Sequence, residues 1–258
     1  MVHYSTVSRR SFLLTTLGGA ATLACGATSE QPVVSIVRIK NDKIQNAVEE
    51  ALDLLGGIER LTKGKERIML KPNLVSPDPK ATTNIEVVST LARLMKSAHK
   101  DVSIGEGSAA AEGFNVKGME IFRTRNADIL SRMQRSVYDQ LGFSELGKSL
   151  RVPLVNLHSG EMGTVKIPGG FVYDEVTLHR SLIETDLLCS VPVMKTHGLG
   201  QVTLGMKNLV GVFPGTVYCS IRGCMHDTAS KVEPSAVAAP VVDMVRSEEH
   251  TSELPVTL

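Results

Sequence analysis

The chain has 258 residues and nearly balanced charge, with 28 Lys and Arg against 27 Asp and Glu and a formal net charge of +1. Nucleic-acid binding usually shows as a basic excess or stripe, so this composition gives no indication of a nucleic-acid partner. The length suffices for a domain of ordinary size with a substantial core.

The first residues indicate export. The segment 8–14 (SRRSFLL) precedes an apolar run that ends at Ala24 and is too short to span a bilayer. Its paired arginines resemble a twin-arginine signal, which the twin-arginine export machinery reads on folded proteins. We therefore expect residues 1–27 to be an export signal, and the protein to be periplasmic or on the outer face of the membrane. A short membrane anchor and lipidation at Cys25 stay open as alternatives.

Strand and helix patterns then alternate. The β-branched segment 33–39 predicts a strand. Helical spacing of apolar residues over 44–55, after a capping box of Asp42 and Gln45, predicts a helix that ends at a glycine pair. A buried strand is predicted at 67–70.

The alternation continues after this strand. Thr83 and Glu86 form a second capping-box pattern, before a helix whose apolar face runs from Ile85 to Met95. Residues 102–104 predict a third strand. Strands alternating with helices are typical of an α/β fold with a mostly parallel sheet covered by helices.

The middle of the chain is less regular and predicts an irregular or hairpin-containing insertion. The expected elements are a helix over 136–146, a strand over 152–157, a hairpin over 163–177, a helix near 180–185 and a strand over 187–193.

The C-terminal residues differ from the rest. Residues 246–254 (RSEEHTSEL) match the translation of a nucleotide sequence that resembles a common sequencing-library adapter. We therefore assign 246–258 to a translated adapter scar. The α/β domain would then cover 28–245 and be incomplete at its C-terminus, with the natural chain continuing past Val245. A natural polar tail is the alternative.

Charged and polar residues follow the predicted parallel strands. Ligands bind outside the carboxyl ends of such strands, so these residues are candidates for a shared site. They are Lys71 and Asn73 after the second strand, Glu106 after the third, and Lys195, Thr196 and His197 after the last. Each also has an ordinary interpretation as a solvated side chain or a turn residue.

The glycine-rich stretch that follows favours a return to the same edge. Gly198, Gly200 and Gly205 are expected to permit close approach and positive φ, and Lys207 and Asn208 to re-enter the site. Lysine and amide groups can hold carboxylate or phosphate oxygens. The alternative is an ordinary strand or helix with Lys207 exposed.

Two further polar residues have a competing structural role. Thr83 and Asn84 precede the predicted helix, where cap residues are common, but a helix start also offers N–H groups to an anion. They are retained as ligand-binding candidates.

Cysteine and histidine usage bears on metals and redox chemistry. The chain lacks a Cys-x-x-Cys pattern, so the fragment has no iron–sulfur ligand set of its own. Carboxylate and imidazole ligands suit Zn, Fe or Ni, and the metal candidates are Glu106, His197 and His226. Cys219 and Cys224 are expected to pair after export. Metal ligation and inert burial are the alternatives for the two cysteines.

Together these residues resemble a known family. The matching blocks are Lys71-Pro72-Asn73-Leu74-Val75, Thr83-Asn84 with Val87-Val88, Gly105-Glu106-Gly107, Val191-Pro192, Lys195-Thr196-His197, Thr203, and Lys207-Asn208-Leu209 with Gly211. They are similar to domain-of-unknown-function family 362, over most of residues 33–245. The family has no settled activity. Some members carry an added ferredoxin-like cluster domain and many resemble twin-arginine substrates, which implies redox or cofactor-related work and a redox partner.

Three functions follow as hypotheses. The first is an exported enzyme or cofactor-handling protein that holds a small anionic ligand or cofactor with Lys71, Lys195 and Lys207, while Glu106 or His197 moves a proton. The second is a metal-dependent enzyme that uses Glu106 and His197. The third is a non-catalytic protein that binds a ligand at the same edge.

Overall fold

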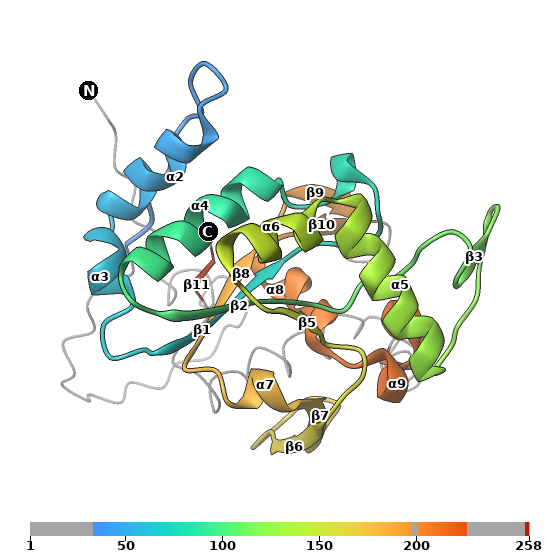
Figure 1. The fold of residues 1–258 in the computed structure, drawn as a ribbon. Helices are drawn as coiled ribbons and strands as arrows, with labels where there is room; N and C mark the ends of the chain where they lie inside the picture. The colour runs from blue at the N-terminus through green and yellow to red at the C-terminus, as the bar shows by residue number, and fades with distance from the viewer. Residues whose placement is uncertain (1–32, 198–200, 226–255, 258) are drawn as a thin grey trace, which may run out of the picture.

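A five-stranded parallel sheet forms the centre of the molecule (Figure 1), with strand order β11-β8-β1-β2-β5. The computed structural model describes residues 33–197, 201–225 and 256–257. The strands are β1 (Arg67–Pro72), β2 (Asp101–Glu106), β5 (Leu154–Asn156), β8 (Leu187–Val191) and β11 (Val256–Thr257). The sheet confirms the expected α/β class. Its edge strand β11 is contributed by residues that the sequence assigns to the adapter scar.

The longer helices pack on one face of this sheet. They are α2 (Ile44–Asp53), α3 (Gly57–Leu61), α4 (Ile85–Ser97), α5 (Ala127–Gln140) and α6 (Phe143–Leu150). In Figure 1, α4 and α6 lie above the sheet. Below it lie α7 and an antiparallel hairpin. Their bounds are β6 (Met162–Lys166), β7 (Glu175–His179) and α7 (Arg180–Ile183).

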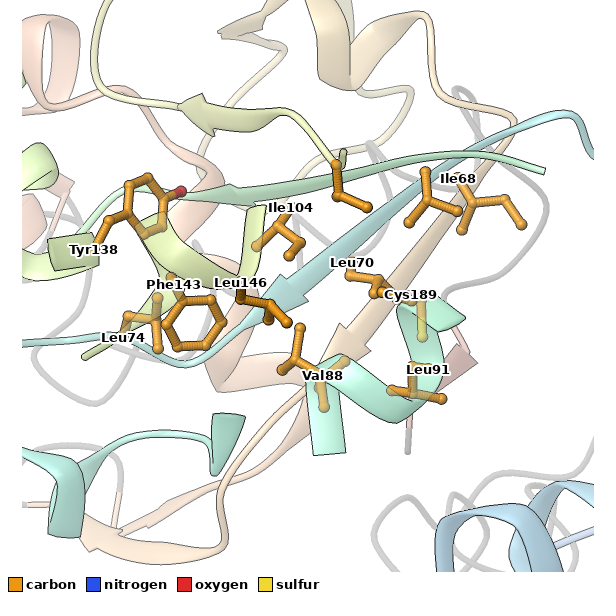
Figure 2. Packing of buried hydrophobic residues seen from close by; sticks show 14 of the residues in the cluster. Ile68, Leu70, Leu74, Val88, Leu91, Ile104, Tyr138, Phe143, Leu146 and Cys189 are labelled. Carbon is orange, nitrogen blue, oxygen red and sulfur yellow. The ribbon is translucent and has the colours of Figure 1, made fainter. Parts of the chain in front are cut away.

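The central strands are buried on both faces, which explains their nearly continuous apolar sequence. Along β1, Ile68 and Leu70 belong to the core cluster on the α4 face, whereas Met69 between them belongs to the cluster on the β6–β7 face. Figure 2 shows the first cluster, where Leu70 lies near Val88 and Leu91 of α4. The sheet is therefore packed between two layers, with one hydrophobic cluster on each of its faces.

Shorter elements lie at the carboxyl end of the sheet and beside it. They are η1 (Pro79–Ala81), β3 (Val116–Lys117), β4 (Glu120–Ile121), β9 (Lys195–His197), β10 (Gln201–Thr203), α8 (Gly205–Asn208), η2 (Leu209–Val212), α9 (Gly215–Tyr218) and η3 (Ser220–Arg222). Strands β9 and β10 pair antiparallel, and so do β3 and β4. Among the described residues, no helix combines the length and apolar character needed to cross a bilayer.

The prediction of a strand at 33–39 is wrong. The segment belongs to no strand, and Val34 and Ile36 are exposed. It lies beside α2, where the Ser35 hydroxyl donates to the Ala51 carbonyl at 2.8 Å. β-branched residues favour extended backbone, but a strand also needs a partner edge, and the described sheet offers none to this segment.

Both capping boxes are also wrong in detail. Lys43 occupies the N-cap of α2 without a side-chain cap bond, and Gln45 donates instead to Glu49. At α4 the N-cap is Asn84, whose side chain accepts from the Glu86 amide at 2.8 Å. Thr83 is turned toward the sheet, so it cannot cap the helix.

The middle region contains more helix than expected. Two helices replace the one predicted over 136–146, because Asn126 caps an earlier start of α5 and Gly142 separates α5 from α6 at φ +78°. The other predicted elements are confirmed as β5, the β6–β7 hairpin, α7 and β8. The parallel pairing of β8 with β1 decides where Lys195 lies.

Candidate functional site

A cavity of about 390 Å³ lies at the carboxyl edge of the parallel sheet. This size is typical of a small-molecule site. The cavity brings together most of the candidates that the sequence predicts: Lys71, Asn73, Glu106, Lys195, His197, Lys207 and Asn208. Their convergence follows from the parallel arrangement of β1, β2 and β8 and from the return of the chain through β10 and α8.

An ion pair lies at the base of the cavity. The Lys71 ammonium donates to the Glu106 carboxylate at 2.8 Å, and both side chains are buried. Glu106 also accepts from the amides of Leu74 and Gly107, at 2.9 and 2.7 Å. Burial lowers the pKa of Lys71, while the Glu106 charge opposes that shift. The pair is therefore held by backbone and side-chain contacts together.

Asn208 connects this pair to the neighbouring strand. Its carbonyl oxygen accepts from Lys71 Nζ at 3.1 Å, and its amide group donates to the Lys71 carbonyl at 2.9 Å and to Ser190 Oγ at 3.0 Å. The side chain is thus fixed against β1 and β8 at once. Asn208 orients Lys71 and leaves the pair little freedom to move.

Three further cations line the same cavity. Lys195 donates to the Ala81 carbonyl and to Asn73 Oδ1. Lys207 is partly buried, and desolvation, followed by repulsion from Arg222, Lys195 and Lys71, lowers its pKa to about 8. Positive charge therefore accumulates in a cavity that Glu106 only partly neutralises.

Arg222 is the most deeply buried of these cations. Its guanidinium donates to the carbonyls of Gly107 and Gly211, at 2.5 and 3.0 Å. Burial lowers its pKa to about 10, although Glu106 acts in the opposite direction. Carbonyl oxygens satisfy donors without cancelling charge, so Arg222 keeps its positive field inside the site.

Two buried polar atoms of cavity-lining residues have no hydrogen-bond partner among the residues that the structure describes. They are Arg222 Nε and Thr203 Oγ1. Buried polar groups are nearly always hydrogen-bonded, so an unpartnered donor beside a cavity indicates a place for a ligand atom or water. The two atoms come from separate segments, η3 and β10.

His197 lies at the same cavity with a neutral ring at physiological pH. Desolvation and the nearby charges of Lys207 and Lys195 lower the pKa of His197 below its usual value. A neutral imidazole can accept or relay a proton without adding to the positive charge of the site.

Gly211 permits the ion pair and the return segment to lie in contact. A Cβ atom added there would stand 2.7 Å from Lys71 Nζ and would overlap the Glu106 carboxylate. The approach requires a residue without a side chain, and φ at Gly211 is not positive. Gly205 also lacks the positive φ expected for it, and Gly198 and Gly200 lie outside the described residues.

Three predicted ligand-binding residues do not line the cavity. The Thr83 hydroxyl accepts from the Asn73 amide at 2.8 Å and donates to the Val191 carbonyl at 2.6 Å, so it joins two strand ends. Asn84 caps α4, and Thr196 is exposed on β9. In the structure these side chains support the edge of the sheet or face solvent.

The described residues do not supply a set of ligands for the proposed metal site. No group of three or more His, Cys, Asp or Glu side chains with suitable positions occurs among residues 33–197, 201–225 and 256–257. His226, the third candidate ligand beside Glu106 and His197, lies outside these ranges. The predicted export signal at 1–27 also lies outside them.

The described cysteines comprise one disulfide and one free thiol. Cys219 and Cys224 form a disulfide, which confirms the predicted pairing. Cys189 is a buried core residue of β8, and burial raises the pKa of its thiol to about 12. It is therefore an inert thiol.

Sequence reasoning missed Arg222 as a site residue. It lies between the paired cysteines, and this was the available signal, because a short disulfide loop fixes the residues that it encloses. Thr203 entered only through the family resemblance. Neither position follows a sheet strand, so the rule of strand carboxyl ends could not find them.

Comparisons with known proteins found a relative that is similar to part of this chain. The thylakoid-associated protein sll1697 of Synechocystis sp. is 26% identical over 167 residues, which are 64% of this chain and 44% of that protein. The chain thus spans less than half the length of this relative.

A solved structure with similarity to the chain is the lactate racemase apoprotein from Thermoanaerobacterium thermosaccharolyticum. Its TM-score is 0.48 at 14% identity, over 80% of this chain and 46% of that chain. A likeness at this level supports no argument about function.

The family described as domain of unknown function (DUF362) matches residues 68–250. The chain therefore belongs to the DUF362 family.

Proposed function

We propose that the chain binds a small anionic ligand, with carboxylate or phosphate oxygens, in the cavity at the carboxyl edge of the sheet. The observation that carries the proposal is the buried guanidinium of Arg222, whose Nε lacks a partner among the described residues while its other nitrogens bind only carbonyl oxygens in that part of the chain. A guanidinium of this kind is suited to an oxyanion.

The surrounding charges support the same proposal. Lys71, Lys195, Lys207 and Arg222 line the cavity, against the carboxylate of Glu106. Repulsion among these cations contributes to the lowered pKa of Lys207, and an anion placed between them would relieve it. Binding of an anion would thus be favoured, because its negative charge relieves the repulsion among the cations of the unliganded site.

Acid–base chemistry on the ligand is the finer part of the proposal. Lys207, with a pKa of about 8, can exchange a proton near physiological pH, and the neutral ring of His197 can accept one. A lysine whose pKa lies in this range suits proton transfer better than an ordinary lysine does. The family resemblance implies a cofactor and a redox partner, and we include in this proposal that the anionic ligand is such a cofactor and that the chain contacts such a partner.

Titration calorimetry with pyrophosphate and with a tricarboxylate tests the binding. Lys207→Gln should weaken binding about tenfold, because a charge-assisted hydrogen bond is worth about 1.5 kcal/mol or more. Lys63→Gln, at an exposed lysine after α3, is the matched control and should bind as the unmodified chain does. Absence of binding of both anions at millimolar concentration would refute the proposal.

We also propose that the protein is exported in folded form. The twin-arginine-like segment 8–14 supports this, and so does the disulfide, since disulfides persist mainly in oxidising compartments.

A further inference from the structure

The loop closed by the Cys219–Cys224 disulfide forms part of the cavity wall. Both Ile221 and Arg222 lie inside this loop and line the cavity. Arg222 reaches across to the carbonyls of Gly107 and Gly211. The disulfide therefore encloses the segment that delivers the buried cation Arg222 to the site.

The backbone of this loop is held in unfavourable conformations. Cys219 has φ +62° and ψ +158°, a region that is occupied almost only by glycine. Ile221 and Arg222 have φ of +55° and +56°, in the left-handed region that favours glycine. Non-glycine residues persist in such conformations only where neighbouring contacts hold them. The restraints on the loop are thus part of what places Arg222.

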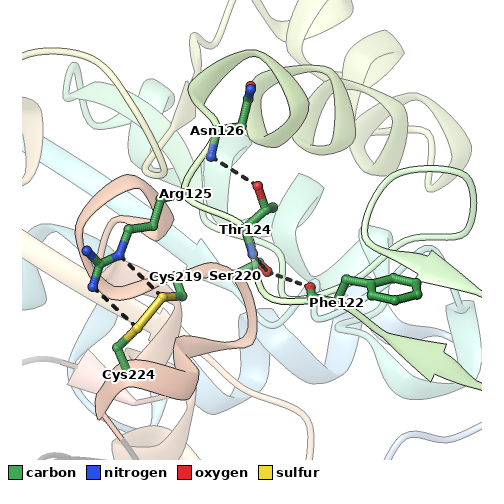
Figure 3. Close-up of a disulfide and its surroundings, with 7 residues drawn as sticks. All are labelled: Phe122, Thr124, Arg125, Asn126, Cys219, Ser220 and Cys224. Atoms are coloured by element: carbon green, nitrogen blue, oxygen red, sulfur yellow. Dashed lines mark hydrogen bonds between the residues drawn. A yellow bond between two sulfur atoms is a disulfide. The ribbon is translucent and has the colours of Figure 1, made fainter.

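Figure 3 shows two of the restraints on this loop. Ser220 joins the loop to the segment before α5, since its amide donates to the Thr124 carbonyl at 2.8 Å and its hydroxyl donates to the Phe122 carbonyl at 3.1 Å. The disulfide is the second restraint. It ties the far side of the loop, beyond Arg222, back to Cys219.

Arg125 contacts both sulfur atoms of the disulfide. Its Nε lies 3.3 Å from Cys219 Sγ, and its Nη2 lies 3.4 Å from Cys224 Sγ. A neighbouring guanidinium stabilises a thiolate and so makes a cysteine a better leaving group. Cys224 is partly exposed whereas Cys219 is 8% exposed, so an external thiol meets Cys224 first.

We propose that Arg125 and the Cys219–Cys224 disulfide form a thiol–disulfide exchange site, and that its redox state controls anion binding in the cavity through Arg222. The reductant is an external dithiol. One of its thiolates attacks Cys224 Sγ, the bond between the cysteines breaks, and Cys219 leaves as a thiolate beside Arg125. The second thiol of the reductant then displaces Cys224, so that the reductant departs as a disulfide and two electrons and two protons remain on the cysteine pair.

Reduction acts on the cavity through the loop. Once the sulfur bond is broken, the left-handed residues can relax, and Arg222 loses the covalent restraint on its C-terminal side, where the buried side chain of Met225 remains. The carbonyls of Gly107 and Gly211 then lose their guanidinium donor. This control of anion affinity rests on the proposed function, whereas the exchange chemistry at Arg125 does not.

The exchange site is tested by the rate of reduction. The full chain is treated with dithiothreitol, quenched by alkylation and examined by mass spectrometry. Arg125→Gln should slow reduction several-fold relative to the unmodified chain, because the thiolate loses its cationic neighbour. Arg135→Gln, an exposed arginine of α5, is the matched control. Equal rates in all three proteins would overturn the exchange site.

The coupling is tested by comparing the oxidised and reduced chain. Reduction should lower pyrophosphate affinity about tenfold and speed hydrogen exchange in the peptides that cover 105–109 and 209–213. Cys219→Ser/Cys224→Ser should behave as the reduced chain under both conditions. Unchanged exchange in these peptides would overturn the coupling, whether or not the anion binds. Pyrophosphate binding that is equal in both redox states would overturn it while leaving the proposed function intact.

Discussion

Lys71 and Glu106 form a buried ion pair at 2.8 Å between adjacent strands of the parallel sheet. Glu106 accepts from two backbone amides as well, so its carboxylate organises the base of the cavity. The pair is both a structural contact and the boundary of the candidate site.

Neutralising one partner of this pair should destabilise the fold. Glu106→Gln leaves the Lys71 charge buried without its counter-charge and sets an amide group against backbone donors, which should lower the free energy of unfolding by about 3–5 kcal/mol. Urea denaturation measures the change. Glu145→Gln, at an exposed position on α6, should stay within about 0.5 kcal/mol of the unmodified chain. A similar small effect at Glu106 would contradict the importance of the pair.

Anion binding should depend on pH through Lys207. Its pKa of about 8 means that the site without ligand loses this charge as the pH rises above 8, so affinity should fall above that point by about tenfold in total, as in Lys207→Gln. The bound anion favours the protonated form and raises the pKa of Lys207. Binding near pH 8 should therefore take up a proton, which calorimetry in buffers of different ionisation enthalpy detects.

Lys207→Arg provides the control for this pH dependence. A guanidinium stays charged throughout the range, so the variant should show a flatter affinity profile and less proton uptake near pH 8. A profile as steep as that of the unmodified chain would assign the dependence to another group.

The close approach at Gly211 should be intolerant of a side chain. Gly211→Ala places a Cβ against the Lys71–Glu106 pair, and we expect a loss of about 1–3 kcal/mol in unfolding free energy together with weaker anion binding. Gly118→Ala is the comparison, because its added Cβ meets nothing within 4 Å although φ there is +62°. It should lower stability somewhat but leave binding unchanged. Normal binding by Gly211→Ala would show that the pair tolerates displacement.

The export proposal predicts a specific failure of transport. Changing Arg9 and Arg10 together to Lys should leave the folded protein in the cytoplasm of a bacterial host, as measured by cell fractionation, because the paired arginines are the feature that the export machinery reads. Arg93→Lys with Arg132→Lys, two exposed helical positions, should not change export. Continued export of the first variant by the general secretory route would refute the twin-arginine interpretation.

The sequence was informative where local pattern and sheet topology agree. Lys71 and Glu106 could be placed together because buried apolar strands that alternate with helices form parallel sheets, and parallel strands present their carboxyl ends at one edge. The strand predicted at 33–39 is wrong because local pattern and sheet topology disagree there. Its β-branched residues fit a strand, yet strand formation depends on a partner that local sequence does not specify.

Arg222 shows a second limit of sequence reasoning. It contacts the carbonyl of Gly107, 115 residues away, through a loop with irregular backbone. No periodicity describes such a loop, and its cysteines predicted a crosslink without indicating which surface the enclosed arginine would face. Long-range placement of this kind depends on the packed fold.

The assembly of the cavity from distant segments has a consequence for folding. Lys71 and Asn208, which are 137 positions apart, must meet while several cations are brought close together, so the last step of folding proceeds against electrostatic repulsion. An oxyanion present during refolding would reduce this repulsion and so favour formation of the native site. Ligand binding would then report that folding is complete. A chain whose C-terminal segment has not docked lacks Lys207 and Arg222 in the site and cannot retain the ligand.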